Sequence, residues 1–298
     1  RTALEVALAP DGGWGWQPEA LRICAVPAPQ KRRRVSACSA PLHGMERMHA
    51  IAPHLIEDWL NYHILIGIDH FTLFDTDGSL EPFVARFVQQ GAVTYHGRWP
   101  AQLSPKLGLL ADGVSAADRR PMLTEPQALD SCLWANRQVS DWVVVLHSFE
   151  EYLHSALFAD GTRLDALLRS WSARLAPRRV ALFELFQEPF GGPRAPSARS
   201  VLSSWTHKRG DLLKGKRGGE WLKAAGNHLK PFSFVADPLN VVHSAVHLAQ
   251  PRGDGQGIVA MEDRVLRVNH YIDLGVNSSR CLHELGGCEV SDGSIAWA

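Results

Sequence analysis

Acidic and polar residues follow the most apolar segment of the chain. Residues 143–146 read VVVL, and this β-branched run predicts a strand that is buried on both faces of a parallel sheet. His147, Ser148, Glu150 and Glu151 come directly after it. Carboxylate oxygens at a strand end can bind a hard divalent cation, and that cation can hold a diphosphate. A solvated acidic turn would have the same residue types, so the segment alone leaves both interpretations open.

A second acidic segment follows another apolar run. Residues 68–74, IDHFTLF, predict a strand, and Asp75 and Asp77 stand in the DTDGS segment after it. Ligands bind at the carboxyl edge of open α/β sheets, so Asp75 and Glu150 are expected at one common edge. Asp75 and Asp77 can equally serve as turn formers, because aspartate side chains accept hydrogen bonds from the backbone of their own turn.

Helical and strand patterns alternate around these two segments. Apolar residues recur at helical spacing from Leu55 to Ile64, with Gly67 placed to end the helix, and Thr124 with Gln127 matches a capping box. Further helices are expected at 81–90 and 162–175, and strands at 35–40, 92–96 and 178–186. The order predicts an α/β fold, Rossmann-like, with a mostly parallel central sheet flanked by helices.

The two ends of the chain have weaker patterns. Residues 1–30 hold several Gly and Pro without a sustained period and are expected to be an N-terminal extension to one domain over residues 31–290. Residues 187–200, rich in Gly, Pro and Ser, predict a loop. Short apolar runs between 227 and 272 predict a smaller C-terminal β-rich part.

Composition excludes several classes of protein. The formal net charge is zero, which disfavours a nucleic-acid partner, and 45% hydrophobic with 21% charged residues is typical of a folded domain. No apolar run approaches the ~20 residues of a membrane span. The sequence begins at Arg1 without Met, so a leader or anchor can be missing and the compartment cannot be inferred.

Other local motifs are weak. Gly210, Gly215 and Lys216 fit part of a P-loop, but Arg217 stands where Ser or Thr is required, so a P-loop is rejected. His243 and His247 lack the glutamate of a zinc-protease helix. The five cysteines show no zinc-ligand spacing, and Cys281 with Cys288 can be either a short bridge or two free thiols.

Several segments together resemble glycosyltransferase family 92. Residues 57–79, EDWLNYHILIGIDHFTLFDTDGS, are similar to the family's W-x-x-Y-H helix, Gly-Val/Ile turn and strand ending in D-N/T-x-S. Weaker similarity follows at Trp99-Pro100, 127–133, 142–153, Phe190-Gly191, Lys230-Pro231 with His243, and 269–271. The resemblance covers about residues 35–287 and implies a GT-A nucleotide-sugar fold for residues 31–290.

The resemblance also implies site residues, with one departure from the family pattern. Where the family has D-x-D-E-F, SFEEYL places Ser148 and Glu150 at the aspartates and Glu151 at the glutamate. A serine hydroxyl is a poorer cation ligand than a carboxylate. By the same resemblance, Glu150 and His270 are the expected ligands of Mn²⁺, and Ser148 is expected beside the nucleotide. His270 can equally be a hydrogen-bonded core histidine.

The same resemblance places Asp75 and Asp77 near the nucleotide. It implies an inverting transferase that moves a hexose, from UDP-galactose or a similar UDP-sugar, to a glycan acceptor in the Golgi lumen. Glu188 is the candidate general base and Glu184 the alternative.

A second hypothesis is a catalytically degenerate GT-A domain that serves as a binding or scaffolding subunit for protein partners. It is suggested by Ser148 and by residues 41–47, PLHGMER, which lack an Arg-Asn-Glu element.

Overall fold

A computed structural model divides the chain into two compact units, Arg1–Arg32 and Arg33–Ala298. It describes residues 3–7, 20–24, 33–100, 124–175, 179–192, 200–208, 233–245, 248–253, 256–274, 288 and 290–292. In the first unit, β1 (Ala3–Ala7) pairs antiparallel with β2 (Ala20–Cys24). Residues 1–30, expected as an extension without a sustained sequence period, therefore contain two paired strands.

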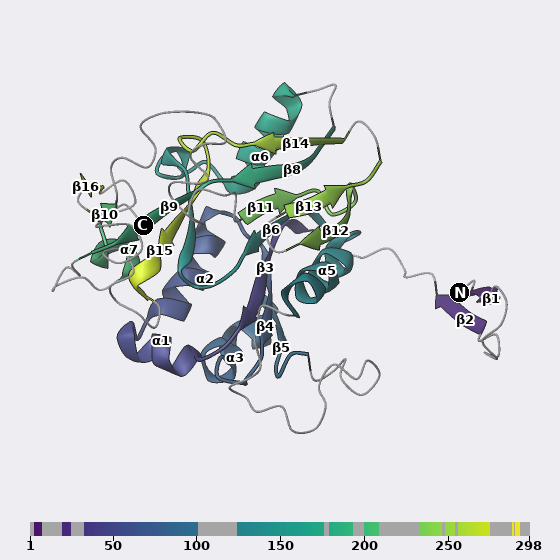
Figure 1. Cartoon of the computed structure of the whole chain (residues 1–298), viewed down its shortest axis with the longest axis horizontal. Coiled ribbons are helices and arrows are strands. Elements are labelled where there is room, and N and C mark those ends of the chain that lie inside the picture. Colours follow the sequence, from purple (N-terminus) through teal and green to yellow (C-terminus); the bar gives the residue numbers. More distant parts are fainter. Residues whose placement is uncertain are drawn as a thin grey trace. The chain divides into compact units, whose positions relative to one another are not determined.

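A seven-stranded mixed sheet forms the centre of the second unit (Figure 1), in the order β14-β8-β11-β6-β3-β4-β5. Strand β3 is parallel to β4 and β6, and β4 is parallel to β5, whereas β11 is antiparallel to both β6 and β8. All five expected strands are present, and β11 makes the sheet mixed. The bounds are β3 (Arg33–Leu42), β4 (His70–Asp75), β5 (Val93–His96), β6 (Ser140–Leu146), β8 (Arg179–Leu185), β11 (Ser233–Ala236) and β14 (Gln256–Ala260).

Helices cover both faces of this sheet. Val144 belongs to the core cluster that contains residues of α1, α2, α3 and α6, and its neighbours Val143 and Val145 belong to the cluster with α5. Because successive strand residues point to opposite faces, the apolar run of β6 is buried on both sides, as predicted. The helices are α1 (Met45–Ile51), α2 (Leu55–Ile66), α3 (Glu81–Gln89), α5 (Glu125–Asn136), α6 (Leu164–Arg174), α7 (Val201–Ser204), η2 (Ala156–Phe158) and η4 (Ile272–Leu274).

Two helix-end predictions have different outcomes. Gly67 ends α2 with φ 116°, a backbone angle that glycine adopts without a Cβ penalty, so this prediction is confirmed. Thr124 does precede α5, but its side chain makes no capping hydrogen bond, so the predicted capping box is absent.

The expectation of a common edge for the two acidic segments is confirmed. Strands β4 and β6 both run parallel to β3, so their carboxyl ends lie at the same edge of the sheet. Asp75 is the last residue of β4, and Glu150 comes four residues after Leu146, where β6 ends.

A second sheet has five strands in the order β16-β10-β9-β15-β7. Among the described strands, the chain passes from the central sheet into this sheet three times, from β6 to β7, from β8 to β9 and from β14 to β15. Gln187–Gly191 forms β9, so the prediction of a loop from residue 187 was wrong. The remaining strands are β7 (Glu151–His154), β10 (His207–Lys208), β15 (Arg267–Tyr271) and β16 (Val290–Ser291), and β12 (Val241–Ala245) pairs with β13 (Leu248–Pro251).

A disulfide that sequence reasoning did not find joins Cys38 of β3 to Cys132 of α5. These residues are 94 positions apart, and their Cα atoms lie 6.1 Å from one another. Cys288 is also disulfide-bonded, so it is not a free thiol, and Cys281, one partner that the sequence allowed for it, lies outside the described residues. The Cys38–Cys132 disulfide fastens α5 to β3, in the middle of the central sheet.

Two sequence predictions fall outside the described part of the chain. The P-loop-like segment at 210–217 lies there, and so does His247, whereas His243 is on β12. Among the described helices, none is both long enough and apolar enough to cross a membrane.

Candidate functional site

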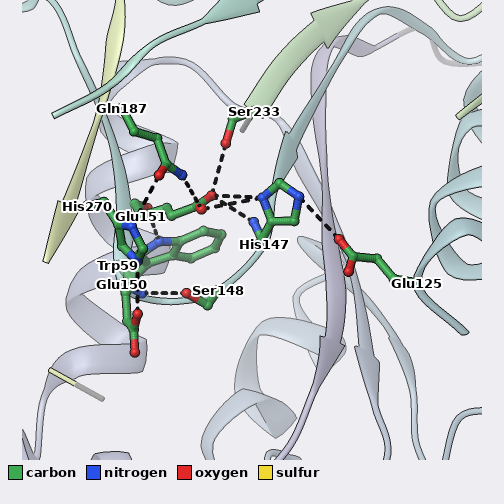
Figure 2. A network of polar contacts seen from close by, with 9 residues as sticks. All are labelled: Trp59, Glu125, His147, Ser148, Glu150, Glu151, Gln187, Ser233 and His270. Atoms are coloured by element: carbon green, nitrogen blue, oxygen red, sulfur yellow. Dashed lines mark hydrogen bonds and ion pairs between the residues drawn. The ribbon is translucent and has the colours of Figure 1, made fainter. Parts of the chain in front are cut away.

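A buried carboxylate lies where the chain leaves β6 for β7. Glu151 is 2% exposed and accepts hydrogen bonds from the backbone N–H of His147 (2.8 Å), the hydroxyl of Ser233 (3.1 Å) and the amide nitrogen of Gln187 (2.7 Å). Figure 2 shows this carboxylate with its surroundings, and we call seven of the residues drawn there the Glu151 network: Glu125, His147, Glu150, Glu151, Gln187, Ser233 and His270. The three donors to Glu151 lie just after β6 and at the first residues of β9 and β11. Because β9 belongs to the second sheet and β6 and β11 to the central sheet, the carboxylate connects the two sheets.

The inner part of the network places an imidazole between two carboxylates. His147 Nδ1 lies 3.4 Å from both oxygens of Glu151, and Nε2 lies 3.2 Å from Oε1 of Glu125, the first residue of α5. Burial alone would lower the pKa of His147, but Glu151 and Glu125 raise it well above its ordinary value. Burial alone would raise the pKa of Glu151, but His147 lowers it to about 2. The inner part therefore holds an imidazolium at neutral pH.

The outer part brings together the two residues expected to hold a cation. His270 Nε2 lies 3.0 Å from Glu150 Oε2, and each side chain is 14% exposed. The two are 120 positions apart, and the pairing of β15 with β7 sets His270 opposite Glu151. His270 Nδ1 lies 3.2 Å from Oε1 of Gln187. An unbroken chain of polar contacts therefore connects Glu150 to the buried Glu151.

Aromatic side chains fix the backbone of this segment. Trp59 is 2% exposed, and its indole N–H donates to the carbonyl oxygen of Glu151 at 2.7 Å. Its ring packs edge-on against Phe149 with centroids 4.9 Å apart. Trp59 lies in the apolar pattern from Leu55 to Ile64 that predicted the helix, and it packs in the core. The Trp59 indole also provides the hydrogen bond that the buried Glu151 carbonyl group requires, so it fixes the position of this backbone segment.

Ser148, expected beside the nucleotide, accepts a hydrogen bond inside its own turn. The backbone N–H of Glu150 donates to Ser148 Oγ at 3.2 Å. Tyr271 N–H donates to the Glu150 carbonyl oxygen at 2.8 Å, which joins the turn to the end of β15. In this structure Ser148 therefore shapes the backbone that presents Glu150.

Asp75 and Asp77 both accept hydrogen bonds within their own segment. Asp75 is buried and accepts from the backbone N–H of Leu80 (2.9 Å) and the hydroxyl of Tyr95 (2.7 Å), and also from two further turn N–H groups. Asp77 accepts from Ser79 N–H of the same turn at 3.0 Å and from Gly44 N–H at 2.8 Å. Burial raises the pKa of Asp75, whereas hydrogen bonds outweigh burial at Asp77 and lower its pKa to about 2. The turn-forming interpretation describes these contacts.

Glu188, the candidate general base, is on β9 and not in a loop. It is 3% exposed, and its two oxygens lie 2.7 Å from Lys208 Nζ and 3.0 Å from Arg267 Nε. The side chains of Lys208 and Arg267 also lie within 3.6 Å of the Asp292 carboxylate. The four charges join strands β9, β10 and β15 to the residue after β16, an arrangement that favours a structural role for Glu188.

Glu184, the alternative base, is half-buried near the carboxyl end of β8, and burial raises its pKa.

Sequence reasoning missed three members of the network, Glu125, Gln187 and Ser233. Glu125 stands in the first turn of a helix, where an acidic residue is common because of the helix dipole, so its sequence position indicated nothing more. Gln187 fell at the start of a segment expected to be a loop. Its neighbour Phe186 ends the predicted strand, and continuing that strand would have been the only signal.

A divalent cation is the group that the expected function requires. Within the described residues, no three or more His, Cys, Asp or Glu side chains are grouped to hold a metal. Glu150 and His270 nevertheless offer one oxygen and one nitrogen 3.0 Å apart. Adjacent ligands about 2.1 Å from an octahedral cation are separated by about that distance. The pair therefore fits a cation that takes its remaining ligands from a diphosphate.

Comparisons with known proteins add no assignment. No model of a known protein family matches the chain, and no curated protein matches it either.

Proposed function

We propose that this chain is a GT-A-type glycosyltransferase that moves a hexose from a UDP-sugar to a hydroxyl group of a glycan acceptor with inversion. The observation that supports it most is the contact of Glu150 with His270, two residues named as cation ligands from sequence resemblance and 120 positions apart. The pair also follows a parallel strand at the carboxyl edge of an α/β sheet, the usual ligand edge.

The residues of the pair have separate roles in this proposal. Glu150 supplies an anionic oxygen, and His270 supplies a neutral nitrogen, at the position that the donor diphosphate would occupy. A bound Mn²⁺ would offset the charge that develops on the leaving diphosphate. Glu184 is the better candidate for deprotonating the acceptor hydroxyl, because Glu188 is already paired with Lys208 and Arg267.

A binding or scaffolding subunit is the second candidate function. The observation that favours it is Ser148, whose hydroxyl stands where the family has a carboxylate and accepts a hydrogen bond from its own turn. With a single carboxylate in the outer pair, cation affinity falls. Under this hypothesis the domain binds a protein partner and no nucleotide.

Thermal unfolding in the presence of UDP and Mn²⁺ tests the proposal. A ligand at 100 times its Kd stabilises the folded state by about 2.7 kcal/mol, which raises Tm by roughly 5 to 10 °C for a domain of this size. We expect that rise with UDP and Mn²⁺ together, and its loss in Glu150→Gln. Glu46→Gln, the same change at an exposed residue of α1, is the matched control. No rise in the parent protein under any of these conditions would favour the scaffolding subunit.

A further inference from the structure

The orientation of the Gln187 amide follows from its buried neighbour. Glu151 accepts a backbone N–H and a serine hydroxyl at Oε2, so its Oε1 faces Gln187 as an acceptor. An acceptor at 2.7 Å requires the amide nitrogen, and Gln187 Nε2 occupies that position. Gln187 is 3% exposed, so water does not offer an alternative partner for a reversed amide. The amide oxygen must then point the other way.

The direction of the amide determines where His270 holds its proton. Gln187 Oε1 is an acceptor only, and it lies 3.2 Å from His270 Nδ1. A hydrogen bond there requires a proton on Nδ1. In the neutral imidazole, Nε2 then has a lone pair, and this lone pair faces Glu150 Oε2 at 3.0 Å. Two acceptors at that distance repel each other unless a positive group binds to both, as an octahedral cation about 2.1 Å from each can do.

We propose that Glu151 and Gln187 are positioning residues that hold His270 in its Nδ1–H tautomer and so direct the Nε2 lone pair to a cation shared with Glu150. A ligating histidine commonly donates its other N–H to an oxygen that fixes its orientation. Here the supporting oxygen is an amide whose own orientation is set by a buried carboxylate. The tautomer follows from the hydrogen bonds of Gln187 alone. That His270 in this tautomer binds a cation held by a diphosphate rests on the proposed function.

Nitrogen-15 NMR of the imidazole tests this inference without metal or nucleotide. We would record the protein at a pH of about 9, where an ordinary histidine is neutral, and assign His270 from the signal lost in His270→Gln. The wild-type protein should show a protonated Nδ1 and an unprotonated Nε2. A protonated Nε2 in the wild-type protein, as the other tautomer or as an imidazolium, would overturn the proposal.

A pair of variants separates positioning from packing. Gln187→Met removes the acceptor for Nδ1, so the proton should move to Nε2, where Glu150 Oε2 accepts it. Ser233→Ala removes one donor to Glu151 but leaves the amide in place, so the tautomer should not change. An unchanged tautomer in a folded Gln187→Met protein would contradict the proposal.

Titration with Mn²⁺ and UDP then gives a separate answer on function. Loss of a supporting hydrogen bond typically weakens metal binding about 10- to 100-fold, and Gln187→Met should show a loss in that range. If the wild-type tautomer is as expected but neither Mn²⁺ nor UDP binds, the positioning remains established and the transferase proposal fails.

Discussion

Two loops at the same sheet edge, one after β4 and one after β6, use their acidic residues differently. In the loop after β4, Asp75 and Asp77 accept hydrogen bonds mainly from backbone N–H groups nearby, so these carboxylates build the loop. In the loop after β6, Glu151 and Glu150 contact side chains from distant strands. An acidic loop is a stronger site candidate when its partners are side chains that the fold brings from far along the chain.

Replacing Glu151 should have the largest effect and separates it from its neighbour Glu150. Glu151→Leu would leave the buried His147 imidazolium with one of its two carboxylates missing. Removing one partner of a buried ion pair costs about 3 to 5 kcal/mol of stability. Glu150→Gln, at a partly exposed residue, should cost less than about 1 kcal/mol. Urea unfolding of both variants measures the difference. Equal midpoints would mean that Glu151 contributes no more to stability than Glu150 does.

The disulfide should have the next largest effect, because it fastens α5 to β3. Helix α5 carries Glu125, which contacts His147 in the loop after β6. Cys38→Ala with Cys132→Ala should lower stability by about 2 to 4 kcal/mol, since the bridge restricts a long loop of the unfolded chain. Calorimetry of the double variant measures this. Treating the parent protein with a reductant should reproduce this loss of stability. A Tm that does not change on complete reduction would contradict a stabilising role for the Cys38–Cys132 disulfide.

Asp75→Asn probes the loop after β4. The variant keeps the shape of the side chain but weakens its bonds to Leu80 N–H and Tyr95 OH, and we expect a loss of about 1 to 3 kcal/mol. UDP binding per remaining folded molecule is the informative second measurement. Unchanged affinity would assign Asp75 to the turn alone, whereas a loss of affinity without a loss of stability would place it at the nucleotide.

The pH dependence of stability should differ in sign between the two loops. The pKa of Glu151 is lowered to about 2, below an unfolded value of about 4.5. Its contribution is therefore complete above pH 4.5 and is lost as the pH falls toward 2. The pKa of Asp75 is raised, so protonation of that carboxyl favours the folded state.

Acid unfolding of two variants measures this contrast. Between pH 4.5 and 2, Glu151→Gln should reduce the fall in stability by about 2 to 3 kcal/mol, and Asp75→Asn should not. A flatter acid limb in the Asp75 variant, with an unchanged one in the Glu151 variant, would reverse the comparison.

The central sheet could be predicted from sequence, but most of the site could not. Local apolar runs encode β3, β4, β6 and β8, because a strand buried on both faces needs contiguous apolar residues. Strand β9, QEPFG, contains polar residues, Pro and Gly, and its pairing with β15 determines it as a strand.

Long-range contacts set the rest of the site. The contacts of Gln187 with Glu151 and of Cys38 with Cys132 span 36 and 94 positions. No local spacing indicates such pairs. Glu150 and His270 were named together only because family resemblance supplied what spacing could not.

The central claim is that the loop after β6 presents a cation site completed by a diphosphate. Titration calorimetry of Mn²⁺ with and without UDP tests it on the parent, Glu150→Gln and Ser148→Asp proteins, with Asp77→Asn as the matched control in the other loop. The account predicts little Mn²⁺ binding without UDP, joint binding in the parent and in Asp77→Asn, none in Glu150→Gln, and tighter binding in Ser148→Asp because a second carboxylate is added. Equal UDP affinity in all four proteins regardless of Mn²⁺, or no UDP binding in any of them, would contradict it.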